Sequence, residues 1–156
     1  MRKSISGWIV LTACSTLIAP ACASSMEHAA AALRAADPAD PAVAGALVIE
    51  QFLRAANTKD YGTMSRLFGT KQGPIVDLYD RRHVNQRMLV LAVLLEHENH
   101  ALQNVAPVPG RGDGARQVIV RMTLRGREAD VPYTIVRSDA GSWLVEQVDL
   151  ERITGR

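Results

Sequence analysis

The chain has very little cysteine: its 156 residues include only Cys14 and Cys22, and both lie near the N-terminus. An exported domain can supplement a small core with disulfides, but the sequence after residue 22 offers no cysteine for one. Aromatic residues are also scarce, at 4%, whereas 47% of the residues are hydrophobic. We therefore expect a domain that is stabilised by a core of Leu, Val, Ile and Ala rather than by disulfides.

The sequence after Lys3 has no formal net charge. Arg2 and Lys3 account for the whole formal charge of +2, because all 16 acidic residues and 16 of the 18 basic ones follow them. Binding to nucleic acid is favoured by basic surfaces that release counterions. A neutral domain lacks this driving force, so we predict no nucleic-acid partner.

Residues 1–23 are typical of a secretory signal peptide. Arg2 and Lys3 form a positive start, an uncharged apolar run extends from Ile5 to Ile18, and small residues lead to Ala23. The run is shorter than the roughly 20 residues that a membrane-spanning helix needs. We therefore expect export across the inner membrane, to the periplasm, the outer membrane or the cell exterior.

Lipidation of Cys22 is the alternative to soluble secretion. Bacterial lipoprotein signals place small residues before a cysteine that becomes the acylated first residue of the mature chain. Ala19-Pro20-Ala21-Cys22 has a suitable position for this, whereas cleavage after Ala23 fits a simple Ala-x-Ala signal. In both cases we expect the membrane to be contacted only through the signal or a lipid anchor.

The remaining chain divides into an Ala- and Pro-rich tether over residues 24–41 and a single domain over 42–156. Aspartates suited to helix capping precede three expected helices. The helices cover residues 41–56, 61–68 and 81 to at least 95, behind Asp40, Asp60 and Asp80. In the third, residues 88–95 are apolar on every side, which predicts burial of most of its surface.

After residue 100 the apolar period changes to that of strands. Alternation and turn residues predict four strands, over residues 102–108, 117–125, 131–136 and 143–150. Short turns between them favour an antiparallel meander. Helices followed by strands predict the α+β class, with the N-terminal helices packed on one face of the sheet.

This order resembles the nuclear transport factor 2-like superfamily, also called SnoaL-like. The resemblance is carried by residues 48–56 with Asp60-Tyr61, by the hairpin of 118–125 and 131–136, and by the closing strand of 141–150, and it spans roughly 43–153. It implies a cone-shaped α+β domain whose helices pack on a curved antiparallel sheet of about four strands. The superfamily includes isomerases, dehydratases, cyclases and non-catalytic members, so the fold does not decide the function.

Four polar residues are expected near the open end of such a cone: Tyr79, His83, Tyr133 and Glu146. Tyr133 and Glu146 alternate with apolar residues of their strands. A carboxylate on an apolar face would have a raised pKa, so Glu146 is a candidate general base, with Tyr133 and His83 beside it. In the plainer interpretation, Glu146 points to solvent or pairs with an arginine.

Aromatic side chains are candidates for contact with a ligand, namely Tyr79, Tyr133 and Trp143. Trp143 follows a glycine turn and suits either stacking on a ligand or filling the core. Arg81 and Arg82 lie at a helix start, where positive charge opposes the helix dipole, so an anion or a partner could bind there.

His97 and His100 are the weak candidates for metal binding. They are three residues apart and would share a face if the third helix continued that far. Two histidines do not complete a metal site without further ligands. The alternative is a polar helix end, where histidine suits the C-terminal dipole.

The leading hypothesis is an exported or lipid-anchored, non-catalytic domain that binds a small apolar ligand or a protein partner at the cell envelope, with no cofactor. A homodimer is a further option. The alternative is a SnoaL-like isomerase or hydrolase that uses an inward carboxylate in the cone cavity.

Overall fold

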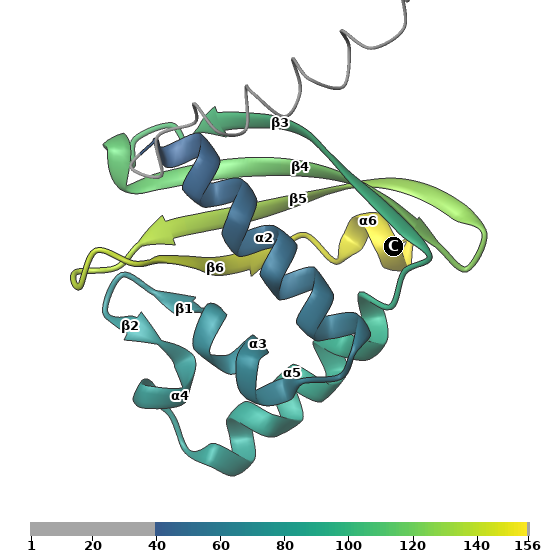
Figure 1. Ribbon diagram of the computed structural model, residues 1–156, viewed down its shortest axis with the longest axis horizontal. Coiled ribbons are helices and arrows are strands. Elements are labelled where there is room, and N and C mark those ends of the chain that lie inside the picture. The colour runs from purple at the N-terminus through teal and green to yellow at the C-terminus, as the bar shows by residue number, and fades with distance from the viewer. Residues whose placement is uncertain (1–39, 156) are drawn as a thin grey trace, which may run out of the picture. The chain divides into compact units, whose positions relative to one another are not determined.

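Helix α2, Pro41–Asn57, begins the part of the chain that the computed structural model describes, which is residues 40–155 (Figure 1). The Asp40 carboxylate accepts a hydrogen bond from the Ala42 N–H at 2.8 Å, and Pro41 takes the first helical position. This confirms the helix start that the sequence predicts. One face of α2 is buried, with Val48, Ile49, Phe52 and Leu53 in the core.

Two further helices begin at the other capping aspartates. Asp60 accepts from the Thr63 N–H at 2.9 Å at the start of α3, Tyr61–Leu67. Asp80 accepts from the N–H groups of the second and third residues of α5, Arg81–Leu94. Both helix starts agree with the sequence prediction. A capping bond joins residues only two or three positions apart, so the local sequence is enough to predict it.

The four long strands form one antiparallel sheet in the order β3-β4-β5-β6 (Figure 1). Their bounds are Asn99–Pro107 for β3, Ala115–Leu124 for β4, Arg127–Arg137 for β5 and Trp143–Val148 for β6. Helix α2 packs across one face of this curved sheet and contacts β3, β4 and β6. The α+β class, with N-terminal helices on a four-stranded antiparallel sheet, is therefore confirmed.

Several short elements connect these parts. They are β1 (Gly69–Thr70) and β2 (Gly73–Pro74), which pair antiparallel, α4 (Ile75–Leu78), a 3-10 turn (Gly112–Gly114) and α6 (Glu151–Thr154). The sequence indicates only a loop where β1 and β2 lie. Segments of two to four residues are too short to show a period, so pattern analysis does not find them.

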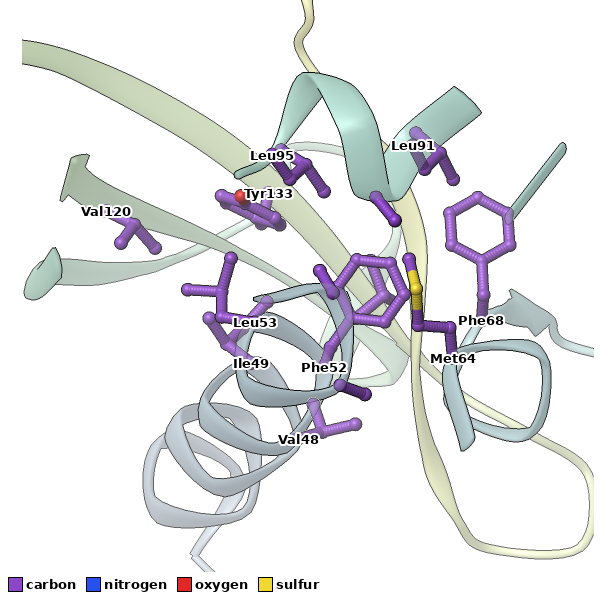
Figure 2. Close-up of a cluster of buried hydrophobic side chains, with 14 of the residues drawn as sticks. Val48, Ile49, Phe52, Leu53, Met64, Phe68, Leu91, Leu95, Val120 and Tyr133 are labelled. Carbon is purple, nitrogen blue, oxygen red and sulfur yellow. The ribbon is translucent and has the colours of Figure 1, made fainter. Parts of the chain in front are cut away.

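The core lies between the helices and the sheet (Figure 2). Tyr133 of β5 is fully buried beside Leu95, and its hydroxyl donates a hydrogen bond to the Met122 sulfur at 3.2 Å. Gly45 of α2 lies directly over the side chain of Ile135. The small residue lets the helix approach the sheet closely.

Helix α5 is less buried than its sequence predicts. Its inner face places Val84, Met88 and Leu91 in the core, and Leu95 at its C-terminal end is fully buried. Its outer face leaves three apolar side chains about half exposed, Leu89, Val90 and Val93. The prediction of burial over most of the surface is wrong because α2, α3 and α4 contact only part of this helix.

The expected signal peptide, the lipidation candidate Cys22 and the tether up to residue 39 lie outside the described residues. None of the helices between residues 40 and 155 is both long and apolar enough to span a bilayer.

Candidate functional site

A cavity of about 450 Å³ lies between α5 and the C-terminal end of β6. Its apolar lining residues are Phe68, Val90, Leu91, Val148 and Leu150. Its polar lining consists of two glutamines together with His83 and Arg87 of α5. The volume falls within the range of small-molecule sites, and mostly apolar walls with a few polar groups are typical of them.

The helical period of α5 explains which of its side chains line the cavity. His83, Arg87 and Val90 are spaced by four and three residues, so they lie on one face of the helix. Sequence analysis identified His83 but missed Arg87. The shared helical face was the signal that could have found Arg87, but this face becomes the wall of a cavity only because the end of β6 lies opposite it.

Arg87 is held by an aromatic ring. Its guanidinium carbon lies 5.0 Å from the centroid of the Phe68 ring, within the range of a cation–π contact. Phe68 is buried, and its ring packs at 6.0 Å from that of Phe52. Among residues 40–155, no carboxylate lies within 4.0 Å of the Arg87 guanidinium, so no ion pair neutralises its charge.

A second hollow, of about 840 Å³, borders the N-terminal half of α5 and is lined by charges of both signs. Asp60 and Asp80 contribute its carboxylates, and both are engaged as helix caps. Arg81 and Arg82, the candidate anion contact, line this hollow and not the cavity. The acidic neighbours make it the less suitable place for an anion.

The four residues expected at the cone opening do not converge. His83 lines the cavity, and the ring of Tyr79 lies 6.4 Å from its ring but is itself largely exposed and not part of the lining. Tyr133 is in the core, and burial raises the pKa of its phenol well above the usual value, so it stays protonated. Trp143 is partly buried and packs against the core, away from the cavity lining.

Glu146 is displaced by a β-bulge. Thr134 pairs with Gln147 and Ile135 pairs with Val145, so Glu146 is the extra, unpaired residue of β6. In a regular strand, Glu146 would lie on the same face of the sheet as Leu144 and Val148. The bulge interrupts the alternation of faces at this residue.

The structure pairs the carboxylate of Glu146 with an arginine. It accepts two hydrogen bonds from the Arg111 guanidinium, one of them at 3.0 Å between Nη2 and Oε1. These bonds raise the pKa of Arg111. The carboxylate is therefore engaged in an ion pair and does not line the cavity.

His97 and His100 are close together, but not on a helix. Helix α5 ends at Leu94, so His97 lies in the following connection and His100 in β3. The helix-face arrangement considered for them is wrong. Their rings nevertheless meet at 4.8 Å between centroids and 82° between planes.

Hydrogen bonds occupy both nitrogens of each imidazole. His97 contacts the Leu95 carbonyl through Nδ1 at 2.8 Å and His100 Nδ1 through Nε2 at 2.9 Å. His100 Nε2 contacts the Glu50 carboxylate of α2 at 2.9 Å. Asn57, also of α2, accepts from the His97 N–H at 3.1 Å and donates to the His97 carbonyl at 3.0 Å.

This network does not have the form of a metal site. His100 lies between Glu50 and His97, so the three groups form a chain and their donor atoms do not converge on one point. Within residues 40–155, no three His, Cys, Asp or Glu side chains gather in an arrangement that could hold a metal ion.

Comparison with known proteins leaves the cavity to be interpreted from its own geometry. No protein-family model matches the chain, and no curated protein is significantly similar to it.

Proposed function

We propose that this protein is an exported or lipid-anchored, non-catalytic member of the nuclear transport factor 2-like superfamily that binds a small, mainly apolar ligand. The observation that carries the proposal is the cavity between α5 and β6, with its volume of about 450 Å³ and its mostly apolar walls. Half-exposed Val90 at its rim would be covered when a ligand binds. Burial of such apolar surface is the driving force for binding.

The polar groups around the cavity favour binding over catalysis. General acid–base chemistry needs at least two convergent polar groups near the reacting atoms. Among the residues that line the cavity, His83 is the side chain of a type that commonly serves as a general acid or base, and its imidazole forms no hydrogen bond with the described residues. Glu146 and Tyr133, the expected partners of His83, are engaged elsewhere.

A neutral fluorescent probe, N-phenyl-1-naphthylamine, tests the cavity with a matched pair of variants of the purified protein. Val90 lines the cavity, whereas Val93, on the same helix and similarly exposed, does not. We expect Val90→Glu to weaken probe binding by about fivefold, because a hydrated carboxylate opposes an apolar occupant. Val93→Glu should bind like the wild type.

Equal binding by both variants, or no binding by the wild type, would contradict the proposal. Native mass spectrometry of the same protein adds a second measurement. A bound small molecule would support the proposal, whereas a homodimer that excludes the probe would show that a second copy covers this face.

A further inference from the structure

We propose that the ligand of this cavity is an amphipathic anion, such as a carboxylic acid with an alkyl or aromatic body, whose charged group pairs with Arg87. The inference rests on the proposed binding function and adds the chemical class of the ligand. It is carried by the charge of the cavity wall and by the position of Arg87.

The cavity wall carries positive charge and no negative charge. Arg87 supplies this charge as a cation, and His83 lies one helical turn earlier on the same face. No aspartate or glutamate is among the lining residues. An anionic group entering the cavity would meet an attractive potential, whereas a cationic one would be repelled.

Arg87 shares the lack of a carboxylate within 4.0 Å with several described arginines, such as Arg54 and Arg125, but it is the arginine that lines the cavity. Arg111, Arg116, Arg121 and Arg152 each lie within 4.0 Å of a carboxylate. The contact that the structure gives the Arg87 guanidinium is with the Phe68 ring instead. A guanidinium held over a ring by a cation–π contact still carries N–H groups in the fork geometry that suits a carboxylate.

The rest of the cavity suits an apolar body. Val90 and Leu91 continue the helical face beyond Arg87, and Val148 and Leu150 contribute from the sheet side. A ligand with its anionic end at Arg87 would therefore cover apolar surface along its remaining length. Charge selects the class of ligand, and apolar burial supplies most of the affinity.

Two probes with the same ring skeleton distinguish the contribution of the anionic charge to affinity from that of apolar burial. N-phenyl-1-naphthylamine is neutral, and 8-anilinonaphthalene-1-sulfonate adds a sulfonate to the same rings. We expect the wild-type protein to bind the sulfonate about three- to tenfold more tightly than the neutral probe, as a partly exposed ion pair allows. This preference should shrink as salt is added, because salt screens the charges.

Two variants that each lose one positive charge test whether Arg87 is the source of the preference for the sulfonate. Arg87→Gln should weaken binding of the sulfonate more than binding of the neutral probe, so that the ratio of the two affinities falls toward one. Arg81→Gln, on the same helix but outside the cavity lining, should keep the preference. Thermal melts of both variants will show that they remain folded.

The outcomes distinguish this inference from the proposed function. If the neutral probe binds but the sulfonate binds no better, or if both variants lose the preference equally, the anionic class is wrong while the cavity still binds ligands. If neither probe binds, the proposed function fails first. Arg87-dependent pelleting with phosphatidylglycerol vesicles would also overturn the inference, because the anion would then belong to a membrane surface.

Discussion

The imidazoles of His97 and His100 meet edge to face, with Nε2 of His97 and Nδ1 of His100 2.9 Å apart. His97 donates its Nδ1 proton to the Leu95 carbonyl, so a neutral His97 offers a lone pair at Nε2. His100 donates from Nε2 to the Glu50 carboxylate, and its Nδ1 faces Nε2 of His97.

Two protons at this contact would break it. If His97 Nε2 and His100 Nδ1 were both protonated, two N–H groups would face each other at the position of the shared hydrogen bond. The network joins α2, through Glu50 and Asn57, to the connection between α5 and β3. Its loss would therefore weaken the attachment of that connection to α2.

Stability should consequently fall on mild acidification. Burial, together with the charge of His100, lowers the pKa of His97 below its usual value of 6.5, although the Leu95 carbonyl and Glu50 oppose this. The unfolded chain then binds a proton to His97 at a pH where the folded chain does not. Folding stability is lost as the pH falls from about 6.5 through the lowered pKa.

Urea denaturation at pH 7.5 and pH 5.0 measures this effect. We expect His97→Gln to lower the free energy of unfolding by about 1 kcal/mol at pH 7.5, through lost hydrogen bonds. The difference in the free energy of unfolding between the variant and the wild type should be smaller at pH 5.0. Only the wild type has His97, whose lowered pKa destabilises the folded state in acid. If this difference in unfolding free energy stayed constant or grew at pH 5.0, the lowered pKa of His97 would be contradicted.

Two leucines of the third predicted helix should behave differently when truncated. Leu95 is fully buried, so Leu95→Ala should cost about 2–5 kcal/mol through lost apolar burial and the cavity that remains. Leu89 is 47% exposed, and Leu89→Ala should cost well under half as much. Thermal melts of the two variants test the one-sided burial of α5, and equal losses would speak against it.

Gly69 should not tolerate a side chain. A Cβ added at Gly69 would overlap the Gly73 carbonyl oxygen and lie 2.9 Å from the Pro74 Cα, and both are backbone atoms of the facing strand β2. We expect Gly69→Ala to destabilise the domain by about 1–3 kcal/mol in chemical denaturation. The control is Gly114→Ala, where an added Cβ would meet no atom within 4 Å. If Gly69→Ala left the free energy of unfolding unchanged, the close approach of β1 and β2 would be contradicted.

The ion pair of Glu146 and Arg111 should contribute little and depend on salt. Both side chains are partly exposed, so Glu146→Gln should cost about 0.2–1 kcal/mol at low salt and less at high salt. A double-mutant cycle with Arg111→Gln isolates the pair. If Glu146→Gln instead raised stability at neutral pH, the carboxylate would be a desolvated group of the kind that a catalytic base requires.

The N-terminus of the mature protein remains a prediction from sequence. If residues 1–23 act as a signal, mass analysis of the exported protein should find a chain that begins at Ser24, or at an acylated Cys22. A Cys22→Ser variant distinguishes the two, because it should abolish acylation but leave simple cleavage after Ala23 intact. A mature protein that retains Met1 would contradict the signal.

Local chemistry explains why the sequence predicted the main elements. The Asp40 cap acts two residues along the chain, and the alternation from Val118 to Leu124 follows from the period of a single strand. Neither depends on distant parts of the chain. The α+β class, the three helix starts and the four strands were therefore within reach of pattern analysis.

Features that depend on distant segments were decided only by the tertiary structure. His100 contacts Glu50, which lies 50 positions earlier in the sequence, and Arg87 lines a cavity because the end of β6 lies across from α5. The bulge at Glu146 depends on the register between two strands, and the one-sided burial of α5 depends on which neighbours cover it. Apolar burial is non-directional, so the pattern of the chain shows which side chains can leave water, but not which surfaces will meet.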